Sequence, residues 1–322
     1  MEFDIIPVSE QQVNKSPVIV VEEKLGLESW CIERVYKYCH QEFISWKVSR
    51  RDCDQKTIHD SSNIRDLIRL TNVILLLNPE FKTVWNFRRS LIASNRLLID
   101  DDLKFSELVL SRKPRNPEVF SYRQFLLQRL PNISLRNVRH ELDLTLKSSS
   151  KYFRNYYSWS HRIWLMNSLR PRFESKRSLG LKSSISLESF NQLLFDEIET
   201  TRNFVRSHVS DFSGYQYIQT LIQYFHTRNN HVNLLELLQT QFHFIDQLSF
   251  LYPDRESIFL HRRFLLKMVK MNDFCSHFDL VEKEKNFIES CSGKESELLI
   301  QRHKRWCDEF GMIENDQVEK SE

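Results

Sequence analysis

Apolar residues recur at helical spacing along most of this chain. In the stretch 64–77, isoleucine and leucine return every three or four positions, which is the period of one buried helix face. The segment "NPEF" at 78–81 then ends that helix, because a residue before proline disfavours the helical conformation. Proline is tolerated near the start of the next helix, where its missing N–H would have no helical partner. The pattern therefore predicts a helical hairpin with a short, proline-containing turn.

Large aromatic residues mark the second helix of five such hairpins. They are spaced 35, 39, 56 and 44 residues apart, which suits an array of stacked helical hairpins. Leucine follows each of them by six residues, and proline precedes three of them by six. An aromatic residue at a fixed phase, with leucine two turns later, predicts core packing between hairpins. We call these residues the anchors; they are Trp85, Phe120, Trp159, Tyr215 and Phe259.

An arginine stands three residues after four of the five anchors, and Ile218 replaces it in the fourth copy. The four are Arg88, Arg123, Arg162 and Arg262. Residues three apart share nearly the same helix face, so the arginines are expected to form a ridge. Such a ridge either pairs with carboxylates, within the chain or at a partner interface, or presents cations to a ligand; the pattern favours pairing. An aromatic residue or histidine stands two residues after each anchor, and His161 is interpreted as a packed ring rather than a catalyst.

The repeats define the domain organisation that we expect. Residues 1–60 form a lead-in with an extended "SPVIVVEEK" stretch and capping helices, and residues 61–272 form the five-copy array. Within the array, the serine-rich and basic segment 170–189 has no apolar period and is interpreted as a surface insertion. Residues 273–310 are a final pair of capping helices, and 311–322 are a disordered tail.

Composition supports an all-α fold and argues against a glycine-rich phosphate-binding loop. Glycine and proline number only 5 and 8 among 322 residues, too few for the turns of a sheet protein or for a glycine-rich phosphate loop. The fold class that we expect is an all-α, alpha-alpha superhelix, a solenoid of five hairpins with capping helices at both ends.

The remaining sequence features exclude several functional classes. The net charge of +3 gives little electrostatic footprint for nucleic acid. The chain has no apolar run of the length that a membrane span needs and no signal peptide, so a cytoplasmic protein is expected. None of the six cysteines lies in a C-x-x-C pair, and no metal cluster or complete catalytic motif is readable. We expect this chain alone to bind no metal and to hold no complete active site.

The repeat resembles a known family. Residues 155–165, "NYYSWSHRIWL", are similar to the alpha-subunit repeat of protein prenyltransferases, whose signature is roughly N-Y-x-x-W-x-x-R-x-x-x-L. Segments 78–92, 114–127 and 253–266 look like further copies. The lead-in at 14–31 resembles the branch of prenyltransferase alpha subunit repeat-containing proteins, which the resemblance links to type III geranylgeranyl transfer.

The resemblance implies an enzyme subunit that is inactive alone. In the family, the alpha subunit wraps a separate beta subunit, here of the Rab geranylgeranyltransferase type, which carries zinc and most of the isoprenoid pocket. The co-substrate implied is geranylgeranyl diphosphate, and the acceptor is a protein with a C-terminal cysteine, for this branch a farnesylated SNARE. A second lipid would make membrane anchoring stable where one chain is marginal.

Matching positions suggest which residues of this chain approach the diphosphate. Arg115 in "PRNP" corresponds to a family lysine, and Asn155 and Tyr156 correspond to the family's Asn-Tyr pair. Tyr157 stands where farnesyltransferase has histidine, and Pro117 stands where the family has tyrosine, so these positions depart from the family pattern. The alternative hypothesis is a non-catalytic helical-repeat scaffold that binds peptides or protein partners, its diphosphate site having decayed at these departures.

Overall fold

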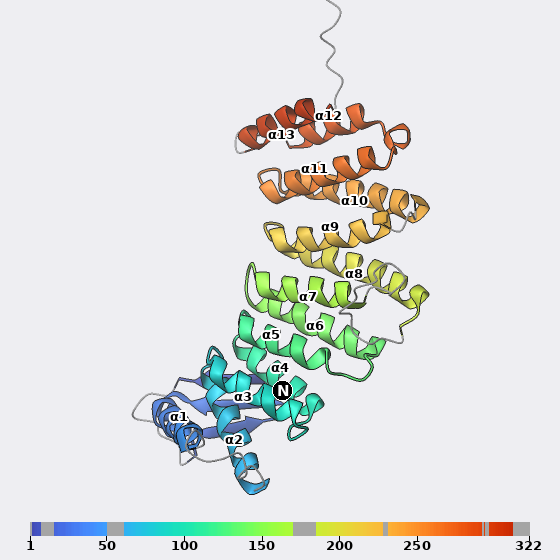
Figure 1. The fold of residues 1–322 in the computed structure, drawn as a ribbon. Coiled ribbons are helices and arrows are strands. Elements are labelled where there is room, and N and C mark those ends of the chain that lie inside the picture. The colour runs from blue at the N-terminus through green and yellow to red at the C-terminus, as the bar shows by residue number, and fades with distance from the viewer. Residues whose placement is uncertain are drawn as a thin grey trace, which may run out of the picture. The chain divides into compact units, whose positions relative to one another are not determined.

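The computed structural model describes residues 2–7, 16–49, 61–169, 185–227, 231–291, 293 and 296–311. The chain forms two compact units, Met1–Ile185 and Ser186–Glu322. In each unit, helices pair into antiparallel hairpins that stack on one another (Figure 1). This arrangement confirms the prediction of an all-α, alpha-alpha superhelical fold.

Three hairpins and one preceding helix build the first unit. In each hairpin the first helix passes to the second through a turn of four residues. The helices are α1 (Ile32–Ser49), α2 (Ser61–Leu77), α3 (Lys82–Ala93), α4 (Ile99–Arg112), α5 (Pro117–Leu127), α6 (Leu135–Lys151) and α7 (Tyr156–Leu169).

The second unit contains three further hairpins. Its last hairpin is shorter than the others and includes the expected C-terminal capping helices. The helices are α8 (Leu187–Ser207), α9 (Phe212–Thr227), α10 (His231–Leu251), α11 (Glu256–Met271), α12 (Leu280–Ser290) and α13 (Glu297–Glu309), with a short 3-10 turn η4 (Cys275–His277) before α12.

Local sequence explains where several helices begin. Asn116 accepts a hydrogen bond from the backbone N–H of Val119, and Pro117 occupies the first position of α5, where it has no helical hydrogen bond to lose. Ser134 and Asn137 form a reciprocal capping box at the start of α6. Asn116 thus fixes the turn within the hairpin α4–α5, and Ser134 fixes the connection from α5 to the next hairpin.

The anchors lie in the core, as their spacing predicted. All five are at most 3% exposed, and the leucines six residues later are at most 5% exposed. Around Trp85 the core joins α1, α2, α3, α4 and α5, and the Trp85 ring packs 4.7 Å from the ring of Tyr122. The anchors therefore contribute to the apolar core that holds neighbouring hairpins together.

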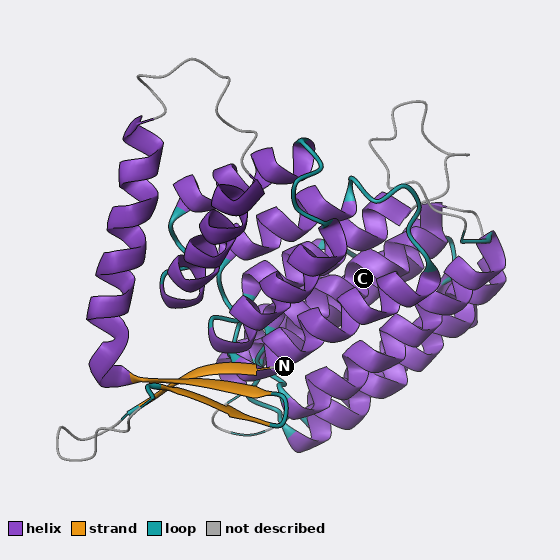
Figure 2. Ribbon diagram, turned by 90° about the horizontal axis from the view of Figure 1, so that it is seen from below, coloured by secondary structure: helices purple, strands orange, loops and turns teal. Residues whose placement is uncertain are grey.

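A three-stranded sheet precedes the helices, where the sequence had indicated only an extended stretch and capping helices. Its strands are β1 (Glu2–Ile6), β2 (Val18–Val21) and β3 (Lys24–Glu28), followed by a 3-10 turn η1 (Ser29–Cys31). The order is β1-β3-β2, with β1 parallel and β2 antiparallel to β3 (Figure 2). The sheet is held on α4, because the backbone N–H of Phe3 donates to Ser111 Oγ at 2.8 Å.

Two expected segments lie largely outside the described residues. Of the expected insertion at 170–189, only 185–189 are described, and Ser186 caps the start of α8. Of the expected tail at 311–322, only Gly311 is described. Within the described residues, no helix has the length and apolarity that crossing a membrane requires.

Candidate functional site

The turns of two neighbouring hairpins carry the residues predicted to approach a diphosphate. Arg115 lies in the turn between α4 and α5, and Asn155 ends the turn between α6 and α7. The exposed Arg115 side chain donates a hydrogen bond to Tyr152 Oη at 3.2 Å. Its guanidinium carbon also lies 5.0 Å from the centre of the Tyr152 ring. The structure thus joins the two turns through Arg115 and Tyr152, and sequence analysis had not singled out Tyr152.

Asn155 is buried and positions the turns instead of facing a ligand. Its side-chain amide donates to the carbonyl of Pro114 at 2.7 Å and to the carbonyl of Ser148 at 3.1 Å. Its side-chain oxygen accepts the backbone N–H of Ser158 and so caps α7. The predicted role of Asn155 in contacting diphosphate is therefore corrected: its fully buried amide clamps one turn to the other.

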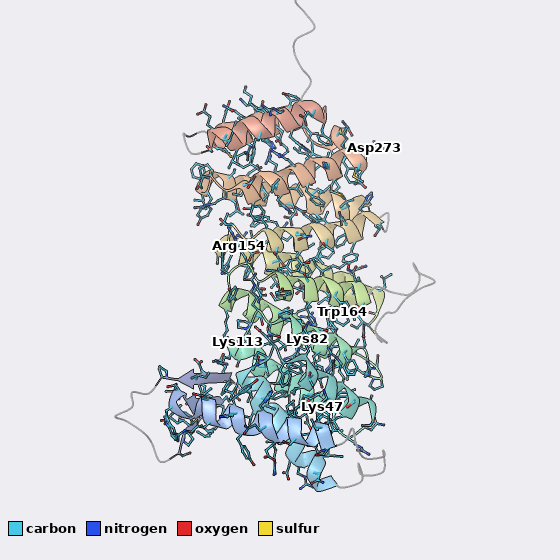
Figure 3. All side chains as sticks on the ribbon, turned by 60° about the vertical axis from the view of Figure 1, so that its left-hand side comes forward. Lys47, Lys82, Lys113, Arg154, Trp164 and Asp273 are labelled. Atoms are coloured by element: carbon cyan, nitrogen blue, oxygen red, sulfur yellow. The ribbon has the colours of Figure 1, made fainter. Side chains whose placement is uncertain are left out.

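Tyr156 and Tyr157 are exposed at the start of α7. They are 59% and 37% exposed, and their rings meet edge to face with centroids 5.8 Å apart. Phe153 and Arg154, which come before the buried Asn155, are also exposed, and the guanidinium carbon of Arg154 lies 4.9 Å from the ring centre of Phe153. Figure 3 shows Lys113 and Arg154 at this same edge of the first unit. We call this set the turn surface: Arg115, Tyr152, Phe153, Arg154, Tyr156 and Tyr157.

The turn surface combines cations, hydroxyl donors and apolar rings. Guanidinium groups suit phosphate oxygens because they offer several N–H donors in a planar fork. Phenolic hydroxyls can donate further hydrogen bonds, and exposed ring faces can pack against an apolar chain or a partner's side chains. The chemistry fits an anionic group with an apolar tail, or an aromatic-rich protein contact.

The ridge arginines form buried ion pairs within the chain. Each of the four is at most 1% exposed. Arg88 on α3 pairs with Asp102 on α4, Arg123 on α5 pairs with Glu141 on α6 (Nε–Oε1, 2.8 Å), and Arg262 on α11 pairs with Glu284 on α12 (Nε–Oε1, 2.8 Å). The second helix of one hairpin is thereby tied to the first helix of the next.

This burial decides between the two interpretations of the ridge. Arg162 likewise donates inward, to the carbonyl of Leu142 at 2.7 Å. Because the anchors and arginines face the core of this chain, they do not present a partner interface, and that predicted role is corrected. In the described residues, three of the ridge arginines pair with carboxylates of this chain.

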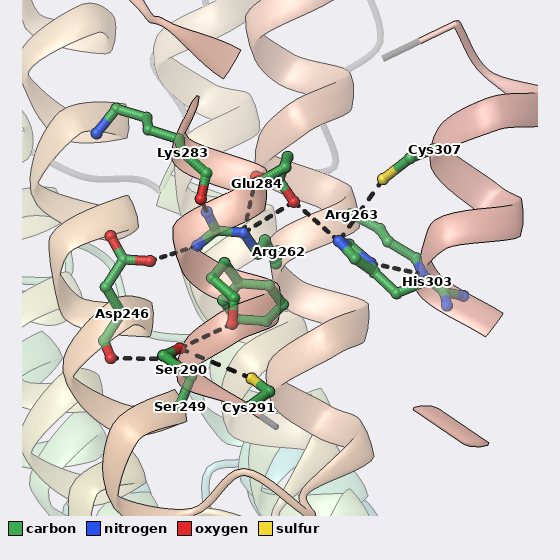
Figure 4. A network of polar contacts seen from close by, with 11 residues as sticks. Asp246, Ser249, Arg262, Arg263, Lys283, Glu284, Ser290, Cys291, His303 and Cys307 are labelled. Carbon is green, nitrogen blue, oxygen red and sulfur yellow. Dashed lines mark hydrogen bonds and ion pairs between the residues drawn. The ribbon is translucent and has the colours of Figure 1, made fainter. Parts of the chain in front are cut away.

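Asp102 and Glu141 of the ridge pairs, and also Glu197, bind the ring two residues after the next anchor. Tyr122 donates to Asp102, Tyr217 donates to Glu197 at 2.7 Å, and His161 Nε2 lies 2.8 Å from Glu141 Oε1. In the last hairpin, His303 Nε2 lies 2.8 Å from Glu284 Oε2 (Figure 4). His161 therefore has the structural role predicted for it.

The carboxylate is a repeat position that sequence analysis missed. Asp102, Glu141 and Glu197 each stand eighteen residues before an anchor, a regularity that the anchor alignment could have revealed. The signal was hidden because acidic residues are common on every helix of this chain. In the fifth copy the same position is Gln241, which follows the hairpin that carries Ile218 in place of arginine. Loss of the cation is thus matched by loss of the carboxylate, which leaves no unpaired buried charge.

Gln241, which stands in place of the carboxylate, accepts hydrogen bonds from a different arginine. With its amide oxygen turned toward α8, Gln241 accepts from Arg202 Nε at 2.9 Å and from Arg202 Nη2 at 3.0 Å. Nearby, His261 Nδ1 lies 3.2 Å from Gln219 Nε2. Burial, and secondarily the charge of Arg202, lower the pKa of His261 to about 3, so this ring is neutral in the core at neutral pH.

The ion pairs also set protonation states in the core. Burial alone would raise the pKa of Glu141, but the charge and hydrogen bonds of Arg123 and His161 outweigh burial and lower it. Burial, followed by the charge of Asp102, raises the pKa of Tyr122, which keeps that phenol a hydrogen-bond donor. These groups are fixed in one state near neutral pH and serve packing rather than proton transfer.

Among the described residues, one group of potential metal ligands occurs, in the last hairpin. Ligand atoms of Glu284, His303 and Cys307 lie within 4.8 Å of one another and are buried. Arg262 Nε, however, lies 2.8 Å and 3.1 Å from the two oxygens of Glu284 (Figure 4). Burial raises the pKa of the Cys307 thiol to about 12, which disfavours the thiolate that would ligate a metal. Glu284 is therefore the ion-pair partner of Arg262, and we assign no metal to Glu284, His303 and Cys307.

Comparisons with known proteins agree with this geometry. The family model described as "Protein prenyltransferase alpha subunit repeat" matches residues 99–130 and 138–169, which span the hairpins α4–α5 and α6–α7. "Protein prenyltransferase alpha subunit repeat-containing protein 1-A" of Xenopus laevis is 35% identical over 241 residues, covering 69% of this chain and 50% of that protein. "Protein prenyltransferase alpha subunit repeat-containing protein 1" of Homo sapiens is 28% identical over 313 residues, covering 81% of this chain and 71% of that protein.

More distant relatives carry names of enzyme subunits. "Geranylgeranyl transferase type-2 subunit alpha" of Saccharomyces cerevisiae is 24% identical over 237 residues, covering 68% of each chain. The chain spans about half the length of the frog protein that it matches. The fold is that of a helical-hairpin repeat protein with exposed turns and buried ion pairs. Residues 99–130 and 138–169 of this chain match the protein prenyltransferase alpha subunit repeat, and the chain is similar to proteins that are named for this repeat.

Proposed function

We propose that this chain is the alpha subunit of a heterodimeric, cytoplasmic protein prenyltransferase. It would support transfer of a geranylgeranyl group from its diphosphate to a C-terminal cysteine of a target protein, such as a farnesylated SNARE. The turn surface carries the proposal, because Arg115, Arg154 and the exposed tyrosines suit a diphosphate with an apolar chain. Relatives named as alpha subunits of geranylgeranyl transferase type-2 support the reaction class.

The partner would be a beta subunit of the type-2, or Rab, geranylgeranyl transferase. A zinc ion in that subunit would favour the thiolate form of the acceptor cysteine. In the reaction a carbon–sulfur bond forms at the isoprenoid carbon, the carbon–oxygen bond to diphosphate breaks, and the thiol has lost its proton. Arg115 and the hydroxyl of Tyr156 would stabilise the negative charge that develops on the departing diphosphate.

Co-expression with a geranylgeranyl transferase type-2 beta subunit tests this proposal. We expect a stable heterodimer that transfers labelled geranylgeranyl to a protein ending in cysteine. Arg115→Ala should lower the transfer rate about tenfold or more, because one charge-assisted contact to a leaving group is lost. Arg115→Lys should retain part of the rate, and Arg136→Ala, an exposed change on α6, should leave it unaltered.

Two outcomes would contradict the proposal in different ways. Failure to form a heterodimer would exclude the alpha-subunit role altogether. An active heterodimer in which Arg115→Ala and Tyr156→Phe transfer at the wild-type rate would favour the alternative, a helical scaffold whose partner performs all of the chemistry.

A further inference from the structure

Arg115, in the turn between α4 and α5, is held by a neutral partner. Its Nη1 donates to Tyr152 Oη at 3.2 Å, and its guanidinium carbon lies 5.0 Å from the centre of the Tyr152 ring. The ridge arginines, by contrast, are held by carboxylates, as Arg123 is held by Glu141. Within the described part of the chain, Arg115 has no other side-chain hydrogen bond and forms no ion pair.

The neutral partner matters because it leaves the charge of Arg115 uncompensated. Two other exposed cations of the first unit pair with carboxylates: Lys82 Nζ lies 3.2 Å from Glu118 Oε1, and Lys151 Nζ lies 2.7 Å from Glu2 Oε1. A carboxylate fixes a cation but offsets its charge, whereas a phenol fixes a guanidinium and keeps its charge for another anion. The arginine of this turn therefore combines a fixed place with a full positive charge.

The backbone on both sides of Arg115 is fixed as well. Pro114 has a restricted φ angle, and its carbonyl accepts a hydrogen bond from the Asn155 amide at 2.7 Å. On the other side, the side chain of Asn116 caps the start of α5. The two turns are thus joined in the core by Asn155 and at the surface by Arg115 and Tyr152. Both the backbone and the side chain of this arginine have a defined position.

The contact with Tyr152 occupies only one corner of the guanidinium. Arginine carries several N–H donors in a planar fork, and the edge formed by Nε and Nη2 suits two oxygens of one phosphate. Tyr152 accepts from Nη1, and among the described residues the Nε–Nη2 edge of Arg115 has no hydrogen-bond partner. The edge that binds phosphate through two parallel hydrogen bonds is therefore open.

We propose that Tyr152 is a positioning residue: it holds Arg115 so that the open edge of the guanidinium receives the diphosphate of the isoprenoid substrate. The identity of this anion rests on the proposed function. An arginine that is already oriented loses less side-chain freedom when the anion binds, which strengthens the contact. Tyr152 acts through Arg115 and is not required to touch the diphosphate itself.

Kinetics of the heterodimer with its type-2 beta subunit test this role. Tyr152→Ala should lower kcat/KM for geranylgeranyl diphosphate about fivefold, because a cation–π contact and a hydrogen bond to Arg115 are lost. The KM for the acceptor protein should keep its wild-type value, whereas a general structural defect would affect both substrates. Tyr152→Phe keeps the ring and should lose only about twofold. Tyr38→Ala removes another exposed tyrosine, on α1, and should change neither value.

A double-mutant cycle shows whether Tyr152 acts through Arg115. In the heterodimer that already carries Arg115→Ala, the further change Tyr152→Ala should cause no additional loss of kcat/KM, because the group that it positions is gone. Two independent contributions to the same reaction would instead multiply.

A nuclear magnetic resonance measurement on the full-length chain alone does not depend on catalysis. The Hε and Cδ proton resonances of Arg115 should be shifted by the nearby ring of Tyr152. Their absence from the spectrum of Arg115→Lys assigns them. Tyr152→Ala should return them to the values of a solvated arginine, while Tyr152→Phe and Tyr38→Ala should keep the shift.

Three results would overturn the role of Tyr152. They are unchanged Arg115 resonances in Tyr152→Ala, an equal loss from Tyr152→Ala with and without Arg115, or a KM for the acceptor that rises as much as that for the diphosphate. An Arg115→Ala heterodimer that transfers at the wild-type rate would contradict the proposed function itself, and the contact with diphosphate would fall with it. The resonances of Arg115 would then still decide whether Tyr152 holds its guanidinium.

Discussion

A buried arginine is stable only when its donors are satisfied, and Arg123 meets this condition through three different groups. Its Nε and Nη2 bond to Glu141, and its Nη1 donates to the carbonyl of Leu103 and to Ser106 Oγ, both at 2.7 Å. Such a pair need not stabilise the fold more than an apolar pair of equal volume. Removing one partner, however, leaves the other charge buried without compensation. In this chain Ile218 and Gln241 stand at the positions where the other copies have arginine and a carboxylate, so neither charged partner is present there.

Arg123→Met should lower the free energy of unfolding by about 3–5 kcal/mol, because Glu141 would stay buried without its guanidinium. The double variant Arg123→Met with Glu141→Gln should lose clearly less, since no unpaired charge is left. Urea denaturation of the purified chain measures both. Arg136→Met, an exposed arginine on α6, is the control and should change the free energy by less than about 0.5 kcal/mol. A cost for Arg123→Met equal to that of the control would show that the pair contributes no specific stability.

The helical hairpins could be predicted from sequence because their signals are repeated. The apolar period and the anchors recur in every copy, and the proline in three of them, so chance errors at one position do not change the result. The sheet gave no comparable signal, since strands of five, four and five residues are too short for a clear alternating pattern. Asn155 was singled out by its position in the motif. Only the structure shows that its amide donates hydrogen bonds to the carbonyls of Pro114 and Ser148 in two neighbouring hairpins.

Asn155 links its two hairpins, and its substitution should affect both stability and the site. Asn155→Ala removes the cap of α7 and the donors to Pro114 and Ser148, and should cost about 2–3 kcal/mol. Asn155→Asp keeps an oxygen for the cap but loses both donors. If clamping of the turns matters, Asn155→Asp should also slow geranylgeranyl transfer in the heterodimer, at a temperature where it remains folded. Equal transfer rates in wild type and Asn155→Asp would limit this residue to helix capping.

On the scale of the molecule, the exposed turns and the buried ridge have separate tasks. The ridge holds hairpins together, while the turn surface leaves Arg115, Arg154 and the tyrosines open to solvent. Sequence analysis singled out Arg115, Tyr156 and Tyr157 of the turn surface, and it left open whether the ridge pairs within the chain or at a partner interface, because burial of arginine cannot be read from spacing alone. An open set of cations and rings binds an anion weakly, since water screens each contact. A partner that covers the turn surface would strengthen the same contacts by excluding water.

The contrast between a solvated turn surface and one covered by a partner predicts how geranylgeranyl diphosphate should affect thermal stability. At a concentration of 100 times the dissociation constant, the ligand should stabilise the heterodimer by about 2.7 kcal/mol and raise its melting temperature by a few degrees. The isolated chain at the same concentration should show no measurable shift, because its turn surface is solvated. The heterodimer with Arg115→Ala should shift less than the wild type, whereas Lys285→Ala, an exposed change on α12, should shift equally. Differential scanning calorimetry measures all four. An equal shift for the isolated chain would mean that this chain binds the diphosphate by itself, and the partner-dependent site proposed above would be wrong.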